Sequence, residues 1–491
     1  MRHGKISDHI FKKGEFITPI NSLPMMKEFE DEKSWTYGRM PEYLWIGLIL
    51  KHFGRDEGLK KLFGIISELH RLAPELYTAR LSQILRLDND VQKKFYNYIV
   101  CAGAKESLSP LTIYLTASRA PIFAECFYCA EKSIENRCKI IIQTMRDIMD
   151  QHSYESTDVR FVVLYFTLLS GKFHLEKNQV ELLKIYPSSK HTDEIMRMAR
   201  PSVRSSEMMI LTFEKTDSAY LKEFWRCVSE MTDCSIFAIK FPEEKRNITL
   251  YMEKLHDVFT YLSELFSTAD PLDEKMIVLL GIATFSYKRF KEVYEHNLFN
   301  SISGRSCVRV LIEDYIMMKY LVRNADSHDN IWHDFQLYGM GLYKLVLTRY
   351  RESGVDTETH FDEKYVEALI NEFKSEEFIN MDTKYFDKQN IRVKAESVDE
   401  KNLFGLYYDY DSSFEHGLWG AIRESALLKC DNPAHKYHCV PDIEDKTVLK
   451  TVLPDCIMVM NKTLSFLNVL YGIPDKLLNE VINFEIKSIV E

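Results

Sequence analysis

Residues 304–323 read GRSCVRVLIEDYIMMKYLVR. Most of these residues are apolar, and a helix that is apolar on most of its sides is buried in a protein interior. Helical spacing of apolar residues recurs along the rest of the chain, where short polar or proline-containing segments separate the periodic stretches. This pattern is typical of antiparallel helical domains, so the sequence predicts a mainly α, multi-helix protein.

The composition agrees with a helical protein. The 491 residues include only 18 Gly and 14 Pro, together about 7% of the chain against a usual level of roughly 12%. Collagen-like, low-complexity and turn-rich β proteins need these residues often, so the shortage argues against them. With 46% hydrophobic and 28% charged residues, the chain can bury a large core.

Charge and cysteine content narrow the function classes. The 63 Lys and Arg against 73 Asp and Glu give a net charge of −10, which argues against a global nucleic-acid-binding surface but leaves room for a local basic groove. Ten irregularly spaced cysteines are too dilute for a disulfide scaffold. The N-terminal charges precede no apolar core, and no apolar run reaches the roughly 18 residues of a membrane span. We therefore expect a cytoplasmic protein without a signal peptide or a membrane segment.

A change in composition near residue 240 divides the chain into two expected domains, residues 1–240 and residues 241–491. Within the second domain, the charged stretch at residues 389–403 is expected to be a loop.

The region before the boundary differs in its pattern of apolar residues. Met208–Phe213 and Ser235–Phe241 are short apolar runs with β-branched and aromatic residues, which favour strands. A helix is expected between them at residues 217–231. The sequence therefore predicts a small α/β insert near residues 205–241.

Charged residues interrupt the apolar helix along one stripe. At 100° per residue, Arg305, Arg309 and Glu313 lie at about 0°, 40° and 80°, and Arg323 returns to about 0°. Burying a charge is costly unless it is paired, so these groups should face a cleft, a partner or one another. One interpretation is a structural ion pair between Arg309 and Glu313. The other is a recessed cationic stripe for phosphate, to which arginine offers a fixed fork of donors.

A second polar cluster lies at residues 407–424, YYDYDSSFEHGLWGAIRE. Ser412 and His416 are four residues apart and share one face of a helix, and either Ser412 or Ser413 could cap that helix. Gly417 follows the histidine and permits close approach of another backbone or a ligand. A lone histidine here is more often a satisfied core residue, but its polar neighbours favour His416 as a site residue.

Together the two clusters resemble a known family, the HEPN-like helical proteins of bacteria, over residues 250–450. The residues that carry the resemblance are Arg309-Val-Leu-Ile-Glu313 and, about a hundred residues later, Tyr408, Ser412, His416 and Gly417. The resemblance implies a helical bundle that is usually dimeric. Many HEPN domains are metal-independent RNases of toxin–antitoxin or antiviral systems, while others only bind nucleotides or RNA. The resemblance does not extend to residues 1–240.

The HEPN signature is an arginine, a polar residue, three or more further residues and a histidine, and residues 323–328 (RNADSH) fit it. Metal-free RNA cleavage needs a base near the 2′-hydroxyl, an acid at the leaving oxygen and a cation at the phosphate, roles that histidine and arginine can take. The short signature also occurs by chance, so two sets of candidates stay open, and they could converge in the fold. The catalytic candidates are Arg309, Glu313, His416, Arg323 and His328, and the RNA- or phosphate-binding candidates are Arg305 and Ser412.

The metal signal is weak. Cys430, His435, His438 and Cys439 place four ligand types within ten residues. Their spacing is not a usual zinc pattern, and the adjacent His438 and Cys439 would strain one tetrahedral site. No glycine-rich phosphate loop, nucleophile elbow or HExxH motif is present either. We therefore expect neither a metal nor a cofactor.

The leading interpretation is an effector of a bacterial antiviral or toxin-type system. In this interpretation residues 241–491 form a HEPN-like domain that cleaves RNA without metal, and residues 1–240 sense a trigger or bind a partner. The expected partners are RNA and either another protein or a second copy of the chain. The alternative is a non-catalytic helical scaffold that binds a protein or a nucleotide through the same charged stripe.

Overall fold

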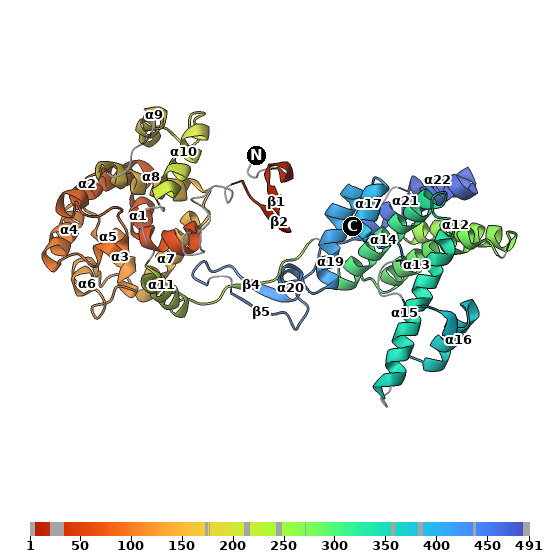
Figure 1. Ribbon diagram of the computed structural model, residues 1–491. Coiled ribbons are helices and arrows are strands. Elements are labelled where there is room, and N and C mark those ends of the chain that lie inside the picture. Colours follow the sequence, from red (N-terminus) through yellow and green to blue (C-terminus); the bar gives the residue numbers. More distant parts are fainter. Residues whose placement is uncertain are drawn as a thin grey trace. The chain divides into compact units, whose positions relative to one another are not determined.

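A computed structural model of the chain (Figure 1) describes residues 5–19, 34–171, 175, 177–210, 217–241, 248–270, 272–354, 359–381, 386–435 and 438–484. The chain divides into two compact units. Unit 1 consists of Met1–Phe237 and Lys429–His438, and unit 2 consists of Ala238–Leu428 and Cys439–Glu491. Helices predominate in both units, as the sequence predicts.

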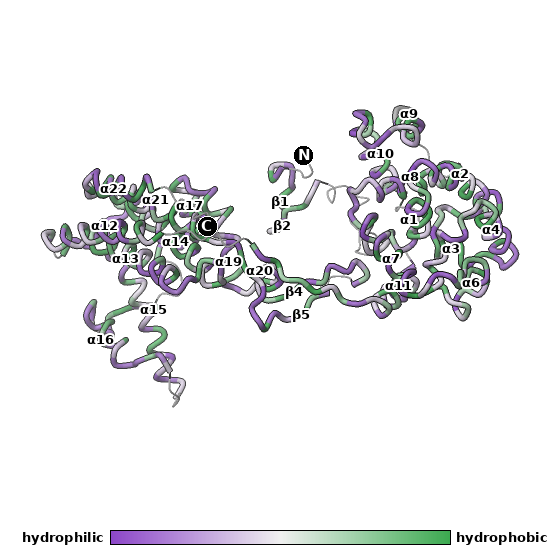
Figure 2. Tube along the Cα trace, turned by 180° about the vertical axis from the view of Figure 1, so that it is seen from behind, coloured by the Kyte–Doolittle hydropathy of each residue, from purple (hydrophilic) through white to green (hydrophobic). Residues whose placement is uncertain are grey.

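In unit 1 a β-hairpin is followed by a series of helices. In chain order they are β1 (Ile10–Lys12), β2 (Glu15–Ile17), α1 (Met40–Phe53), α2 (Arg55–Leu72), α3 (Leu81–Ile84), α4 (Asn89–Cys101), α5 (Lys105–Leu108), α6 (Pro121–Phe127), α7 (Ile134–Met149), α8 (Tyr154–Leu169), α9 (Lys177–Ile185), α10 (Met196–Ile210) and α11 (Ser218–Glu230). In Figure 2 hydrophilic and hydrophobic residues alternate along these helices, which is the pattern of amphipathic helices around a core.

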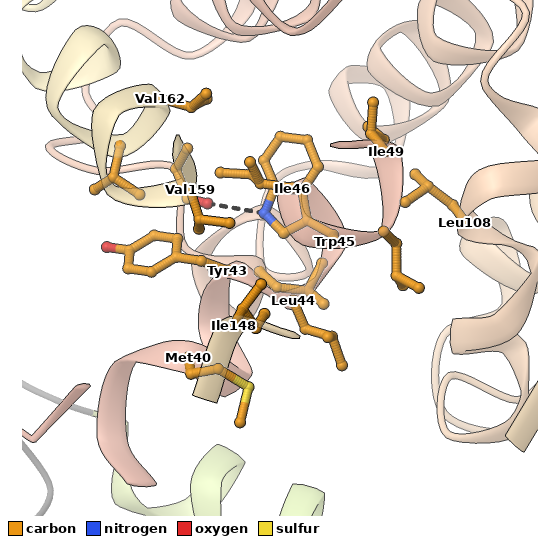
Figure 3. Packing of buried hydrophobic residues seen from close by; sticks show 14 of the residues in the cluster. Met40, Tyr43, Leu44, Trp45, Ile46, Ile49, Leu108, Ile148, Val159 and Val162 are labelled. Carbon is orange, nitrogen blue, oxygen red and sulfur yellow. Dashed lines mark hydrogen bonds between the residues drawn. The ribbon is translucent and has the colours of Figure 1, made fainter. Parts of the chain in front are cut away.

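Helix α1 is the centre of the unit 1 core. All ten residues from Met40 to Ile49 are buried, and the helix packs on α2, α7 and α8. Figure 3 shows its apolar side chains among Ile148 of α7 and Val159 and Val162 of α8. The Trp45 indole N–H donates to the Ala79 carbonyl at 3.1 Å, so this large ring is buried without losing a hydrogen bond.

Unit 2 is built from further helices. They are α12 (Thr249–Ser267), α13 (Glu274–Glu295), α14 (Ile302–Asn324), α15 (Ile331–Ser353), α16 (Glu363–Phe373), α17 (Ile391–Ser397), α18 (Lys401–Leu403), the π-helical turn η8 (Phe404–Tyr408), α19 (Asp409–Glu415), α20 (Trp419–Ser425), α21 (Leu453–Tyr471) and α22 (Asp475–Ile482). Because α17 lies at 391–397, the expectation of a loop across residues 389–403 is wrong.

Helix α14 holds unit 2 together. It packs on α13, α17, α19 and α21, which surround it in Figure 1. Its side chains at Val308, Leu311, Ile312 and Ile316 are at most 1% exposed and belong to one apolar cluster. The buried helix predicted at residues 304–323 is therefore confirmed.

A small three-stranded sheet has the order β3 (Ile236–Phe237), β4 (Leu427–Cys430) and β5 (Cys439–Pro441). Strands β3 and β4 are antiparallel, with Ile236 opposite Cys430 and Phe237 opposite Lys429.

The insert expected near residues 205–241 is confirmed for its helix, now α11, and for a strand at 236–237, but not for a strand at Met208–Phe213. Residues 208–210 belong to α10, and residues 211–213 lie outside the described residues. The reason is that the buried residues of this segment follow helical spacing, at Val203, Ser206, Glu207 and Ile210.

In the described part of the chain, no helix combines the length and the apolar character that crossing a lipid bilayer requires.

The first turn of α14 requires a glycine. A Cβ atom at Gly304 would lie 2.5 Å from the carbonyl oxygen of Leu298 and 3.1 Å from Cγ2 of Val452. The first of these neighbours is backbone, which cannot rotate away. The hydrogen at this position therefore sets how closely α14 approaches the segment before it.

We predict that Gly304→Ala destabilises the protein by roughly 1–3 kcal/mol, because the added methyl group overpacks the start of α14. Gly339→Ala in α15 is the matched control, since a Cβ there meets nothing within 4 Å. Removing a helical glycine without a clash should stabilise the chain by about 0.5–1 kcal/mol. Thermal unfolding of both variants, followed by circular dichroism, tests the prediction, which fails if the two substitutions shift the midpoint in the same direction.

Candidate functional site

A row of polar side chains lies where α14 packs on the segment formed by η8 and α19. We name this row the polar seam, and its members are Ser306, Arg309 and Glu313 of α14 together with Tyr408, Ser412 and Glu415. In each segment the three residues follow helical spacing, so they project from one face. The seam therefore follows directly from two periodic stretches that are about a hundred residues apart in the sequence.

Arg309 is the centre of the polar seam. Its Nε donates to Ser412 Oγ at 3.1 Å, and its Nη2 donates to Tyr408 Oη at 2.8 Å. Nη1 lies 3.4 Å from Glu313 Oε2 within the same helix. The guanidinium also lies 4.8 Å from the centre of the Tyr408 ring. These contacts hold the guanidinium in one orientation.

Tyr408 connects the arginine to the carboxylate. Its hydroxyl accepts from Arg309 and donates to Glu313 Oε2 at 3.1 Å. Burial, together with the nearby Glu313 carboxylate, raises the pKa of Tyr408 to about 12. The phenol therefore stays protonated at neutral pH and keeps its donor role.

The seam is only partly buried. The side chains of Arg309 and Glu313 are 20% and 28% exposed. Arg309 and Glu313 form the ion pair that one sequence interpretation predicts. Both side chains also reach the surface, as the other interpretation, a phosphate-binding stripe, requires. At the far end, Ser306 Oγ donates to Glu415 Oε2 at 2.5 Å, which extends the seam along α14.

His416 lies next to the seam. It caps the C-terminus of α19, where its backbone N–H donates to the Ser412 carbonyl at 3.1 Å. The residue is exposed, and its ring makes no hydrogen bond or ion pair with the residues that the structure describes. Gly417 follows with φ +57°, a left-handed conformation that ends the helix. The imidazole is thus one helical turn from Ser412 and accessible to a ligand.

Arg305, which the sequence predicts to bind phosphate, lies in the interior of unit 2, where it is only 6% exposed. Its Nη2 donates to the Lys450 carbonyl at 2.9 Å, and the guanidinium lies 5.6 Å from the ring centres of both Tyr410 and Phe414. The neighbouring Asp411 is buried as well, and burial raises its pKa to about 7 although Arg305 opposes this shift. Arg305 is a structural link between α14, α19 and the segment at residue 450.

The second candidate set does not join the seam. Arg323 and Arg309 are fourteen residues apart on one helix, which separates them by about 21 Å along its axis. Arg323 is exposed and pairs with Asp399 at 3.2 Å, and His328 Nε2 lies 2.8 Å from Asp334 Oδ2. The two sets therefore do not converge within unit 2.

A further charged group, which the sequence reasoning missed, lies on another side of α14. Glu400 accepts from Tyr315 Oη at 3.0 Å and from Lys319 Nζ at 2.8 Å, and Lys462 Nζ of α21 lies 3.3 Å from its other oxygen. Tyr315, Lys319 and Lys462 also line an open cavity of about 510 Å³. The carboxylate lies between the two ammonium groups, so the arrangement has the character of a structural ion-pair cluster.

Metal-ligating residues gather in unit 1 and not at the seam. Among the described residues, Cys234, Cys430, His435 and His438 have their donor atoms within 4.8 Å of one another. Cys430, His435 and His438 belong to the four ligand types that lie within ten residues of sequence. The fourth of these, Cys439, does not take part, and the distant Cys234 does. The strain expected from adjacent His438 and Cys439 ligands therefore does not arise.

Residues 276–435 match a family model described as a family of unknown function (DUF5677). The matched span runs from α13 to His435 and contains the whole polar seam, His416, Arg323 and His328. None of the curated proteins and none of the solved structures compared with the chain matches it. The seam thus lies in a segment shared with other proteins, whose function the family description leaves open.

Asp314, the neighbour of Glu313 on α14, points to α13. Ser286 Oγ donates to its Oδ2 at 2.6 Å. Burial raises the pKa of Asp314 to about 7, the Ser286 hydrogen bond opposes the shift, and Glu313 adds to it. Since the pKa is about 3.9 in an unfolded chain, the native state binds this proton more tightly. The protein should therefore lose stability as the pH rises from about 4 to about 7.

We predict that Asp314→Asn weakens this pH dependence, because the amide cannot ionise and can still accept from Ser286. At pH 8 the variant should be more stable than the unchanged protein by roughly 1–3 kcal/mol, and the difference should shrink towards pH 5. Thermal midpoints measured across this range test the prediction. Asp329→Asn, at an exposed position of unit 2, is the matched control and should leave the pH profile unchanged. A constant difference between Asp314→Asn and the unchanged protein at every pH would contradict the assignment.

Proposed function

We propose that the protein is an RNA-cleaving effector of a bacterial antiviral or toxin-type system and that the polar seam with His416 is its active site. The observation that carries this proposal is the position of Arg309. Its guanidinium is held in one orientation by Tyr408 and Ser412 and is partly exposed, and the accessible His416 follows Ser412 by four residues. The residues that carry the HEPN-like resemblance lie on α14 and on the segment formed by η8 and α19.

In the proposed cleavage, Arg309 binds the phosphate and His416 transfers the protons. Arginine has five N–H donors, and the three contacts of Arg309 with protein side chains use one each, which leaves two for a phosphate. A guanidinium stabilises the negative charge that develops on the non-bridging phosphate oxygens when the 2′-hydroxyl attacks. Neutral His416 would accept the 2′-hydroxyl proton, and the resulting imidazolium can return a proton to the leaving 5′-oxygen. The products are a 2′,3′-cyclic phosphate and a 5′-hydroxyl, and no metal is needed.

The rival function is a non-catalytic scaffold that binds a protein or a nucleotide through the seam. One observation favours it: every nitrogen of the Arg309 guanidinium already faces a side chain of unit 2, as in a structural ion pair. In that case the exposed face of the seam would bind a ligand without changing it.

We propose a cytoplasmic location, which fits the ten cysteines because all of them are unpaired. Unit 1 would sense a trigger or bind a partner, either another protein or a second copy of the chain.

We predict that the purified protein cleaves single-stranded RNA without added metal and that His416→Ala lowers the rate by about 10²–10⁴-fold, the usual contribution of a general acid or base. Arg309→Lys should also slow cleavage, because lysine keeps the charge but loses the fork. End-labelled RNA and gel analysis provide the measurement, with circular dichroism to confirm that helicity is retained. His52→Ala, an exposed histidine of unit 1, is the matched control and should cleave at the original rate.

Three results would decide against the seam. Full activity in both variants would exclude it as the active site. Loss of activity in Arg323→Ala or His328→Ala, with His416→Ala unaffected, would move the site to the end of α14. Absence of cleavage by the unchanged protein, together with normal growth of cells that express it, would favour the scaffold.

A further inference from the structure

Four side chains from two distant stretches of sequence meet in unit 1. Cys234 lies between α11 and β3, Cys430 ends β4, and His435 and His438 follow it before β5. Cys234 Sγ is 3.4 Å from Nδ1 of each histidine, and Cys430 Sγ is 3.5 Å from His435 Nδ1. All four donor atoms lie within 4.8 Å of one another.

These distances suit a tetrahedral zinc ion. Zinc binds cysteine sulfur at about 2.3 Å and histidine nitrogen at about 2.0–2.1 Å, so the nitrogen and sulfur of one tetrahedron lie about 3.6 Å apart. The observed separations of 3.4–3.5 Å agree with that edge. We propose that Cys234, Cys430, His435 and His438 form a zinc site.

His435 is oriented for this role. Its Nε2 lies 3.1 Å from the Ser229 carbonyl and 3.0 Å from the Thr232 carbonyl. Carbonyl oxygens only accept, so Nε2 carries the proton and Nδ1 presents its lone pair to the two sulfurs. A metal-bound histidine typically donates its other N–H to a carbonyl or carboxylate in this way, which fixes the tautomer and the direction of the ring.

Hydrogen bonds outside the four ligands hold the two segments in place. The Ser235 backbone N–H donates to Cys430 Sγ at 3.3 Å, an outer hydrogen bond of the kind that orients a metal ligand. Asn432 is only 4% exposed, and its Nδ2 donates to the Asp233 carbonyl at 2.8 Å and to Thr232 Oγ1 at 3.1 Å. The Asp431 N–H donates to the Ser235 carbonyl at 3.0 Å. The ligands are therefore arranged by the fold around them.

The donor set indicates zinc and a structural role. Two thiolates with two imidazoles in a tetrahedron are typical of zinc, and two thiolates neutralise its charge. All four positions come from the protein, so no position remains for a water molecule or a substrate. A cation can reach the ligands because Cys234 is exposed and because it borders, with both histidines, an open cavity of about 470 Å³.

The ion would act as a cross-link. Lys429–His438 belongs to unit 1, although the chain on both sides of this segment belongs to unit 2. Zinc would bind Cys430, His435 and His438 of this segment to Cys234, across nearly two hundred residues of sequence. Because the ligands are brought together only in the folded chain, the free energy of metal binding would stabilise this attachment.

Metal analysis of the full-length protein tests the proposal. The protein is purified without a polyhistidine tag and without chelator, and zinc is measured by mass spectrometry. We expect about one zinc per chain, and a fall of at least fivefold in Cys430→Ser and in His435→Ala. Cys439→Ser is the matched control, because Cys439 is adjacent to His438 in sequence but outside the cluster, and it should keep its zinc.

A second measurement needs no variant. Protein stripped with a chelator is titrated with Co²⁺ under reducing conditions, and one equivalent should produce the intense visible absorption of tetrahedral cobalt with thiolate ligands. Substoichiometric zinc in the purified protein together with a weak octahedral cobalt spectrum would overturn the proposal. A Cys234–Cys430 disulfide, found by peptide mass spectrometry of protein kept under reducing conditions during purification, would overturn it as well. RNA cleavage is not a readout here, so the outcome is independent of the proposed function.

Discussion

Unit 2 depends on one constraint: α14 is buried on most of its surface, so each charge on its buried part must find a partner. The charged groups of α14 bond to different neighbouring segments. Arg305 is hydrogen-bonded to the Lys450 carbonyl, Arg309 to side chains of η8 and α19, and Asp314 to Ser286 of α13. Since breaking such a contact leaves a buried or half-buried polar group unsatisfied, these bonds help to set the positions of the surrounding helices.

The same constraint creates the candidate site. Arg309 is only partly buried. It is paired with Glu313, and its side chain is still accessible to a ligand. Tyr408 is essential to this arrangement because its hydroxyl accepts from Arg309 and donates to Glu313. Arg323, at the exposed end of the helix, has no such requirement and makes only a surface ion pair, which contributes little free energy.

In unit 1 the pairing of strands β3 and β4 brings the residues of the proposed zinc site together. Strand β3 places Ile236 opposite Cys430, and this register brings the turn that carries Cys234 to the segment that carries His435 and His438. The buried Asn432 then bonds across the two segments, so the cysteines and histidines converge without any helical periodicity between them. The β3–β4 register therefore helps to bring the four ligands together, and Cys439 is not among them.

Local patterns in the sequence were enough to predict the helical class, the buried helix at residues 304–323 and the Arg309–Glu313 pair, because each depends on spacing within a few turns of one helix. The tertiary structure alone decided that Arg305 is buried and that Cys234 replaces Cys439. It also decided that the charged stretch at 389–403 contains α17, where the buried Lys394 binds Asp387 at 2.5 Å. These outcomes depend on partners from other elements, up to nearly two hundred residues away, and helical or strand periodicity holds no information about which distant segments pack together.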